Sequence, residues 1–421
     1  MNVAILGSGG REHALSKKIS ESRKIERIYC IPGNAGTSKF ATNINIELNN
    51  FQKLLKFFKN NFIDLVVIGP EKPLVDGLAD FLKLNRIKVF GPNKKAARLE
   101  GSKIFTKNLC KKYKIPTAKF GIFKNKKKSF QFIKNVKLPI VIKADNLAAG
   151  KGVYICNTVN QCKKAIKEIF NGKFGKAKKV LIEEYLNGEE MSYFIISDGK
   201  SFKKFHTAQD HKRIFENDKG PNTGGMGAYT PSGLINKKLD KKILKKIILP
   251  TLKAIKDMKT KYIGFLYAGL MIVNEEPYLI EYNVRMGDPE CQTILPLLKT
   301  DLLKIINETC NQNLKKIKIE WFKKKSICIV LSSRGYPGAY KKNILIKNLD
   351  NLKINKNTHI FHAGTKLVKN KFYSTGGRVL NFVSTSSSLK IARSFSIQLI
   401  NKLKWNNGFF RKDIGHKIIN I

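Results

Sequence analysis

The sequence lacks several features that mark specialised classes of protein. Its seven cysteines form no CxxC pair and their number is odd, which argues against a disulfide framework and against a zinc site. No apolar run approaches the length of a membrane span. The N-terminal stretch MNVAILGSGGREHA has only a short apolar run, with no basic segment before it, and therefore does not resemble a signal peptide. We expect a soluble, cytoplasmic protein with reduced thiols.

Acidic residues are also scarce. The chain has 31 aspartates and glutamates against 80 lysines and arginines, which gives a net charge of +49. Such an excess is typical of nucleic-acid-binding proteins, and that function is one alternative. The lysines are nevertheless scattered, and no basic tract is interleaved with aromatic residues. We expect weak, salt-sensitive binding of polyanions and no specific nucleic-acid partner.

The length of 421 residues and the hydrophobic content of 42% predict a folded protein of two to four domains. In the first hundred residues, short β-branched runs at Val3–Leu6, Arg27–Ile31, Ile63–Gly69 and Ile87–Gly91 alternate with helix-like segments. This alternation predicts a doubly wound parallel sheet with right-handed crossovers. Ligands of such a sheet bind beyond the carboxyl ends of its strands.

The pattern changes near residue 101. Three strands (IVIKA, VYIC and VLIEEYL) around a helix predict a small α+β unit, and two long antiparallel pairs follow. One pair turns at Asp198–Gly199; the other is YAGLMIVNEEPYLIEYN, and the helix LDKKILKKIIL before it meets Pro250. The last part is strand- and glycine-rich with one helix. We predict an α/β and α+β multidomain protein with domains at 1–100, 101–324 (small subdomain at about 122–189) and 325–421.

The glycine turn GSGGREHA follows the first strand and opens a helix. Free N–H groups and the helix dipole make such a turn an anion site. Glu12 stands where a dinucleotide fingerprint has its third glycine, and no acidic residue ends the second strand, which argues against NAD. Arg11 suits a phosphate monoester through its planar fork. A nicotinamide oxidoreductase and a turn without any ligand are the alternatives.

A second glycine-rich stretch, IKADNLAAGKGV, looks like a phosphate loop but has Gly152 where a Walker A loop places Ser or Thr for magnesium. Lys143 ends a strand that reads as buried, and a buried lysine is costly unless an anion meets it. With Lys103 on another element, it is expected to neutralise the phosphates of a nucleotide. The loop Leu147–Gly152 is suited to fold over those phosphates and exclude water.

Oxygen ligands for a metal lie further along the chain. In EYNVRMGDPE, Glu281 and Asn283 share one face of a strand, and their oxygens suit Mg²⁺. Arg285 lies on the same face and is placed to meet charge on a transferring phosphoryl group. Glu183–Glu190 hold four carboxylates beside a strand end, where a carboxylate can hold ribose hydroxyls; a solvated acidic face is the alternative.

Together these residues resemble an ATP-grasp ligase. The resemblance narrows to the phosphoribosylamine–glycine ligase family. The motifs of that family occur in the family's order from Met1 to about Gly415; they are GSGGREHAL, PGNAG, GPEKPLVDGL, GSKIFTK, QDHKR, GPNTGGMGAYTP, GFLYAGLM, YNVRMGDPE, HAGTK, GGRVL and RKDIG. It implies a pre-ATP-grasp domain, a two-lobed ATP-grasp domain with a lid, and a C-terminal domain. It also implies that ATP drives the joining of glycine to 5-phosphoribosylamine through glycyl phosphate, in the second step of purine synthesis.

The resemblance assigns roles to single residues. The implied ATP-binding residues are Lys103, Lys143, Gly150, Lys151, Gly152, Glu183, Glu184, Leu186 and Glu190. The implied substrate-binding residues are Gly9, Gly10, Arg11, Glu71, Asp210, Lys212, Arg213 and Asp288. Glu281 and Asn283 are the implied ligands of Mg²⁺ or Mn²⁺, and Arg285 is the implied catalytic residue.

The chain departs from the family at few positions. Asn146 stands where the family has Gly, and Asn tolerates positive φ better than most residues. Tyr282, Val284 and Met286 replace Phe, Cys and Phe, and we expect them on the packed face. A monomer without membrane partners is expected, and a hand-off from the preceding amidotransferase stays open. Another ATP-grasp ligase, such as a carboxylase acting on a purine intermediate, is the last alternative; it would lack GPNTGGMGAY.

Overall fold

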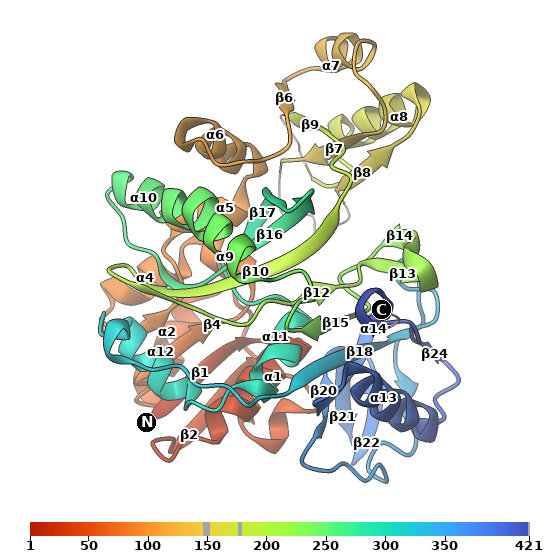
Figure 1. Cartoon of the computed structure of the whole chain (residues 1–421). Coiled ribbons are helices and arrows are strands. Elements are labelled where there is room, and N and C mark those ends of the chain that lie inside the picture. Colours follow the sequence, from red (N-terminus) through yellow and green to blue (C-terminus); the bar gives the residue numbers. More distant parts are fainter. Residues whose placement is uncertain (146–151, 176–178, 420–421) are drawn as a thin grey trace.

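The computed structural model of the chain describes residues 1–145, 152–175 and 179–419. In Figure 1 the N-terminal and C-terminal regions lie next to each other at the base, the central region lies above them, and a small lobe projects at the top. None of the helices in the described ranges has the length and apolar character that a bilayer span requires.

The first hundred residues form a parallel sheet, as the alternation of strands and helices predicts. Its strand order is β3-β2-β1-β4-β5. The strands are β1 (Asn2–Gly7), β2 (Arg27–Pro32), β3 (Thr42–Asn43), β4 (Leu65–Ile68) and β5 (Val89–Phe90). The helices are α1 (Gly10–Ser20), α2 (Phe51–Asn60), α3 (Glu71–Asp76), α4 (Leu78–Leu84) and α5 (Lys94–Gly101), with a 3₁₀ turn η1 (Thr37–Lys39). From β1 the chain adds β2 and β3 on one side of the sheet and then β4 and β5 on the other side. The topological switch point, where ligands of such sheets bind, therefore lies between β1 and β4.

Both faces of this sheet are covered, because alternate residues of β1 point to opposite sides. Val3 and Ile5 pack against α1 and against α12 (Leu302–Cys310). Ala4 and Leu6 pack in the cluster that contains α2 and α4. The short strand β3 has no signal in the sequence, since two residues are too few to show alternation.

The small lobe is an antiparallel sheet of order β6-β9-β7-β8 with two helices. Its elements are β6 (Phe120–Phe123), α7 (Lys126–Ile133), β7 (Ile140–Ala144), β8 (Val153–Cys156), α8 (Val159–Phe170) and β9 (Val180–Glu184). The two helices share a separate apolar cluster with β7 and β9. The α+β unit predicted for this segment is therefore confirmed.

The two predicted antiparallel pairs join into one sheet of order β11-β10-β16-β17. Its strands are β10 (Glu189–Asp198), β11 (Phe202–Lys204), β16 (Ile263–Val273) and β17 (Glu276–Asn283). The turn after Asp198 is confirmed, and Gly199 adopts a φ of +83° there. One face is covered by α6 (Lys103–Tyr113), α9 (Lys237–Ile243) and α10 (Leu249–Asp257). A π-helical segment, η3 (Leu244–Ile248), joins α9 to α10, so the helix continues past Pro250.

The C-terminal region is built on a six-stranded antiparallel sheet covered by α13 (Leu389–Leu403). Its order is β12-β15-β18-β23-β20, with β24 pairing with β18. The strands are β12 (Gln209–Asp210), β15 (Gly227–Thr230), β18 (Lys325–Ser333), β20 (Thr358–His362), β23 (Arg378–Ser386) and β24 (Gly408–Phe409). A smaller sheet contains β19 (Ile344–Leu345), β21 (Thr365–Val368) and β22 (Lys371–Ser374), and the last described helix is α14 (His416–Ile419).

Packing crosses the limits drawn from the sequence. Strands β12 and β15 come from the central segment, yet they complete the C-terminal sheet. Between them lies a separate hairpin of β13 (Arg213–Phe215), η2 (Glu216–Asp218) and β14 (Lys219–Asn222). The segment with α11 (Glu290–Ile294), η4 (Leu295–Leu297), α12 and η5 (Leu314–Lys316) packs against the N-terminal sheet. The domain limits 1–100, 101–324 and 325–421 stay predictions. They divide the chain by sequence position, whereas the edge of a sheet can pair with a strand from any part of the chain.

Buried histidines join the N-terminal region to the C-terminal sheet. The backbone N–H of His362 in β20 donates to Nδ1 of His13 in α1 over 2.8 Å, and Asn34 donates to the carbonyl of His362 over 2.9 Å. Burial holds the pKa of His13 well below its ordinary value. It also lowers the pKa of His362 to about 3.

These pKa shifts predict a loss of stability in acid. An unfolded chain takes up a proton at His362 near its ordinary pKa of 6.5, whereas the folded protein resists protonation down to about 3. The free energy of unfolding should therefore fall as pH falls from 6.5. His362→Asn should reduce this fall by up to about 1.4 kcal/mol per pH unit. Urea denaturation at pH 7.5, 6.0 and 5.0 measures the slope, and equal slopes in variant and wild type would refute the prediction.

Candidate active site

A cleft of about 830 Å³ lies where the N-terminal, central and C-terminal regions meet. The predicted site residues among those that line it are Gly9, Arg11, Glu71, Lys103, Lys143, Gly152, Glu183, Glu184, Leu186, Glu190, Asp210, Lys212, Arg213, Glu281, Asn283, Arg285 and Asp288. Gly150 and Lys151 lie outside the described residues. Most of the predicted site is thus brought to one place from distant parts of the chain.

Gly10 differs from the other predicted residues because it does not line the cleft. A Cβ at this position would collide with the side chains of Gln292 and Asn381. Glycine at this position allows close packing of α1 against α11 and β23. The contact between Gly10 and substrate stays a prediction.

Two lysines reach the cleft from α6. The helix begins after Ser102, whose hydroxyl accepts a hydrogen bond from the N–H of Phe105 over 3.1 Å, a typical N-cap. Lys103 and Lys107 are then four residues apart and share one face of the helix. Burial lowers the pKa of both side chains, while Glu281 opposes the shift at Lys103 and Glu183 opposes it at Lys107.

Glu183 binds two buried lysines at once. Glu183 pairs with Val141 across the sheet. Lys143 lies two residues after Val141, so the side chains of Glu183 and Lys143 lie on the same face of the sheet. Lys143 Nζ donates to one carboxylate oxygen over 2.8 Å, and Lys107 Nζ lies 3.2 Å from the other. The second contact is an ion pair without good hydrogen-bond geometry, and Lys107 instead donates to the hydroxyl of Thr117. The expectation that an anion meets the buried Lys143 is therefore met within the chain.

The two oxygen donors predicted for a metal lie side by side on β17. Glu281 pairs with Gly269 and Asn283 with Tyr267, so both face the cleft. Tyr282 between them is only 1% exposed. Val284 and Met286 are also buried, which confirms the packed face expected for these three residues.

The donor set of β17 fits a cation that is shared with a substrate. Burial opposes ionisation of Glu281, but Lys212, Lys103 and Lys143 outweigh it and hold its pKa below the ordinary value. The carboxylate is therefore charged. No cluster of three His, Cys, Asp or Glu side chains suited to a metal occurs among the described residues. Further ligands would have to come from phosphate oxygens or water, as is usual for Mg²⁺.

Arg285 is held at the cleft by two carboxylates from the N-terminal region. Its guanidinium lies 3.2 Å from Glu71 and 2.9 Å from Glu100. Glu100 also accepts a hydrogen bond from the N–H of Val284 over 2.7 Å. Burial opposes ionisation at Glu71, but Arg285 and Arg11 hold its pKa below the ordinary value. At Glu100 burial outweighs Arg285 and raises the pKa to about 7.

At the N-terminal glycine turn, where an anion site is expected, carboxylates of the chain accept hydrogen bonds. Gly9 N–H donates to a carboxylate oxygen of Glu12 over 2.7 Å, and Arg11 Nε donates to the other over 2.6 Å. Arg11 also donates to the carbonyl of Met286, and its own N–H donates to Asp288. Glu12, the residue that breaks the dinucleotide fingerprint, thus accepts from one N–H of the turn and from Arg11. The anion site at the turn and substrate contact by Gly9 and Arg11 stay predictions.

The opposite wall carries paired charges around Asp210. Lys212 Nζ lies 2.6 Å from Glu190. Burial raises the pKa of Asp210 well above its ordinary value, and Glu290 adds to the shift while Lys212 opposes it. Oδ1 of Asp210 is buried and finds no hydrogen-bond donor among the described residues. This oxygen is therefore available to a donor on a bound molecule.

Among the further residues that line the cleft and were not identified from the sequence are Glu100, Lys107, Glu290 and Arg378. Arg378 lies 3.3 Å from Asp288, and Glu290 is 3% exposed and accepts a hydrogen bond from Ser192. All four lie inside or directly beside the family motifs GSKIFTK, YNVRMGDPE and GGRVL. The motifs were the available signal, but they do not distinguish cleft residues from their neighbours.

The chain matches three models of one protein family. They describe the N domain, the ATP-grasp (A) domain and the C domain of phosphoribosylglycinamide synthetase, and they match residues 1–100, 101–291 and 326–417. Among similar proteins, the phosphoribosylamine–glycine ligase of Agrobacterium fabrum is 45% identical and covers 100% of this chain and 99% of its own. That of Caldanaerobacter subterraneus is 43% identical, with coverage of 98% and 99%.

Solved structures agree with this match. A phosphoribosylamine–glycine ligase from Thermotoga maritima superposes with a TM-score of 0.86 at 34% identity, and covers 98% of this chain and 100% of that one. A biotin carboxylase from Campylobacter jejuni gives a TM-score of 0.75 at 14% identity, with coverage of 100% and 95%. The latter similarity concerns the fold alone. The predicted fold class, with an N-terminal parallel sheet, an ATP-grasp domain and a strand-rich C-terminal domain, is confirmed.

Glu100 generates a prediction opposite in sign to that for His362. A glutamate in the unfolded chain ionises near pH 4.5, whereas Glu100 in the folded protein holds its proton up to about pH 7. Between these values the unfolded chain has lost a proton that the folded one keeps, so this residue makes the free energy of unfolding fall as pH rises. Glu100→Gln should remove that contribution, at most about 1.4 kcal/mol per pH unit.

Urea denaturation between pH 4.5 and 7.5 measures the effect. Glu47→Gln is the matched control, because Glu47 is exposed and the substitution should leave the pH dependence as it is. A Glu100→Gln protein whose stability follows the wild-type pH profile would show that Glu100 ionises normally.

Proposed function

The chain belongs to the phosphoribosylglycinamide synthetase family, and on this basis we propose that it joins glycine to 5-phosphoribosylamine with ATP as the energy source. The products are N1-(5-phosphoribosyl)glycinamide, ADP and phosphate, in the second step of de novo purine synthesis. The observation that carries the proposal is the convergence of Lys103, Lys143, Glu281, Asn283 and Arg285 on one cleft.

The charge of the cleft supports an ATP site between the two lobes. Lys103, Lys107 and Lys143 line this part of the cleft together with Glu183 and Glu281. Burial lowers the pKa of Lys103 and of Lys107 although neighbouring carboxylates oppose the shift, so their positive charges are costly in this poorly solvated place. The phosphates of ATP would stabilise those charges. In the proposal, Lys103 and Lys143 hold the phosphates, Gly150, Lys151 and Gly152 belong to the covering loop, and Glu183, Glu184, Leu186 and Glu190 bind the nucleoside.

Mg²⁺ or Mn²⁺ would be held by Glu281 and Asn283 together with phosphate oxygens. Such an ion supplies charge screening on the transferred phosphoryl group. The chain's own contribution is that β17 fixes both oxygens on one face and that nearby lysines keep Glu281 ionised.

The chemistry requires no nucleophile from the enzyme. The carboxylate of glycine attacks the γ-phosphorus of ATP, which gives glycyl phosphate and releases ADP. The amine of 5-phosphoribosylamine then attacks the glycyl carbonyl, loses a proton and displaces inorganic phosphate. Catalysis rests on positioning and on stabilising charge. Arg285, oriented by Glu71 and Glu100, serves the transferred phosphoryl group.

The acceptor substrates bind on the side of the cleft formed by the N-terminal turn and the C-terminal sheet. Gly9, Arg11, Glu71, Asp210, Lys212, Arg213 and Asp288 line that side in the proposal. Asp210 offers a buried oxygen without a donor, which suits a substrate amine. We further propose a cytoplasmic monomer, with a transient hand-off of the labile amine from the preceding enzyme.

The proposal is tested by one assay. Purified protein is supplied with ATP–Mg²⁺, glycine and freshly generated 5-phosphoribosylamine, and the reaction is followed by mass spectrometry for glycinamide ribonucleotide and by release of ADP. ADP release should require both glycine and the amine, and bicarbonate should replace neither. Turnover driven by bicarbonate alone would identify a carboxylase instead.

Two variants test the site map. Lys143→Ala and Asn283→Ala should each lower kcat by about a hundredfold or more, since each removes a group that stabilises charge on the phosphates. The melting temperature should show that both remain folded. Lys137→Ala is the control, because this lysine is exposed on the same lobe and should keep full activity. Near-normal turnover in either test variant would remove that residue from the site.

A further inference from the structure

The C-terminal motif RKDIG has no role in the chemistry proposed above, yet it lies against the wall of the cleft. Residues 411–417 follow the last strand, β24, and run beside the hairpin β13–β14. Arg411 does not line the cleft, whereas Arg213, Asp218 and Asn222 of the hairpin and Lys417 of the segment do. Arg411 therefore contacts elements that carry cleft residues without lining the cleft itself.

Arg411 is fully used by this contact. Its side chain is 1% exposed. Nε and Nη2 donate to the two oxygens of Asp413 over 2.8 and 2.7 Å. Nη1 donates to Asp218 over 2.9 Å and to the carbonyl of Arg213 over 3.0 Å. The planar guanidinium thus joins its own segment to the start of β13 and to the turn η2 of the hairpin. Lysine cannot reproduce this geometry.

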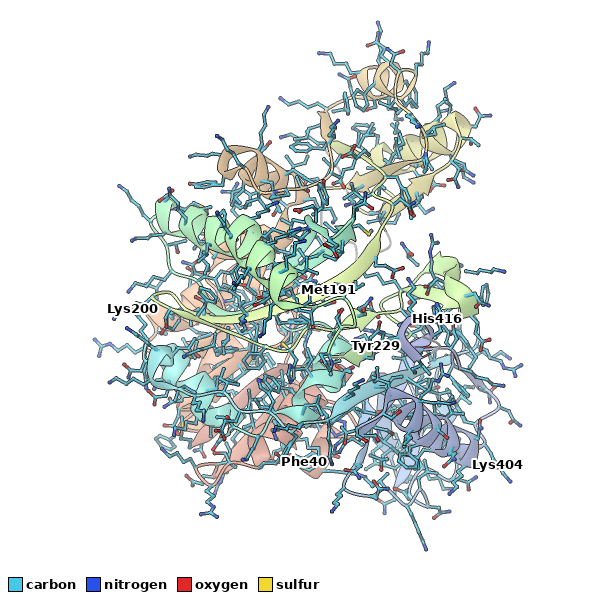
Figure 2. The ribbon with its side chains drawn as sticks, viewed as in Figure 1. Phe40, Met191, Lys200, Tyr229, Lys404 and His416 are labelled. Atoms are coloured by element: carbon cyan, nitrogen blue, oxygen red, sulfur yellow. The ribbon has the colours of Figure 1, made fainter. Side chains whose placement is uncertain are left out.

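Further bonds follow the same junction. Asn217 N–H donates to Asp413 over 2.8 Å, and Lys412 N–H donates to Glu216 over 3.1 Å. Gly415 N–H donates to Nε2 of His211 over 3.1 Å. The ring of His211 lies 5.9 Å from that of Tyr229 and 5.6 Å from that of His416, and Figure 2 shows Tyr229 and His416 near each other at this junction.

The hairpin depends on such support. Its two strands form a sheet of their own, with Arg213 opposite Asn222, Phe215 opposite Lys219 and an irregular register between. An isolated two-stranded hairpin is marginally stable in water. Ile214 is buried, but Phe215 at the tip is 59% exposed, so apolar packing on one side cannot fix the hairpin by itself.

We propose that Arg411 is a positioning residue, which holds the hairpin β13–β14 so that Lys212, Arg213 and Asn222 keep their places on the acceptor side of the cleft. This inference rests on the proposed function for the identity of the acceptors, glycine and 5-phosphoribosylamine. The ATP side is built from α6, β7, β9 and β17, which Arg411 does not contact. Loss of the arginine should therefore weaken acceptor binding and leave ATP binding unchanged.

The test compares Arg411→Met, Arg411→Lys and Asp413→Asn with the wild type. KM for glycine or for 5-phosphoribosylamine should rise about tenfold in Arg411→Met, since small displacements of positioning groups have effects of this order or larger. KM for ATP should stay within about twofold. Arg411→Lys should be intermediate, because it keeps the charge and loses the fork. If Arg411→Met does not fold, Asp413→Asn replaces it as the test. Asp413 lies outside the cleft lining, and its substitution should weaken the same junction.

Arg393→Met is the matched control, since Arg393 is a half-buried arginine on α13 of the same region and should change neither KM. Hydrogen exchange provides a readout that is independent of activity. Amides of residues 213–222 should exchange faster in Arg411→Met and Asp413→Asn, while those of β18 and β23 keep the wild-type rate. Equal acceleration in both places would indicate general destabilisation and overturn the inference, as would unchanged KM values in all three variants.

The two proposals fail separately. If the wild-type protein forms no glycinamide ribonucleotide, the proposed function falls, and hydrogen exchange still decides whether Arg411 holds the hairpin. If the wild type is active and Arg411→Met keeps both acceptor KM values, only the positioning role falls.

Discussion

The central physical constraint on this molecule is the cost of buried charge. Lys107 and Lys143 share the carboxylate of Glu183, and all three side chains are almost inaccessible to water. Burial lowers the pKa of Lys107 although Glu183 opposes the shift, so this carboxylate compensates the charge of the lysine only in part. A polyanion bound in the cleft would compensate it further. The cost of buried charge also explains why Glu183, Glu281 and the lysines must be placed by rigid strands and a capped helix, since a misplaced charge would be left unpaired.

The same constraint operates on the N-terminal side, with a different outcome. Glu12 folds back on its own glycine turn and satisfies both the turn and Arg11. Arg285 is shared between Glu71 and Glu100, and burial raises the pKa of Glu100 to about 7. Internal pairs therefore fix the orientation of the arginines before any substrate binds. Such preorganisation is what a ligase without a covalent nucleophile requires.

The cleft exists because the regions interleave. Strands β12 and β15 leave the central segment to complete the C-terminal sheet, α12 returns to cover the N-terminal sheet, and residues 411–417 reach back to the hairpin β13–β14. Each crossing brings polar side chains to a common boundary. The many lysines take little part in this arrangement: Lys200 and Lys404, for example, project from distant edges of the molecule (Figure 2). This agrees with a charge excess spread over the surface.

The sequence by itself determined the alternation of strands and helices in the first hundred residues, both long hairpins, and the shared face of Glu281 and Asn283, because these follow from local periodicity and turn chemistry. Most of the residues that the family motifs assigned line the cleft. Only the tertiary structure decided that Glu12 accepts hydrogen bonds from Gly9 and Arg11, that Gly10 packs closely against α11 and β23, and that Glu100, Lys107 and Arg411 contact the charged groups of distant elements. Those roles depend on which side chains meet across elements that are hundreds of residues apart, and no local pattern encodes such contacts.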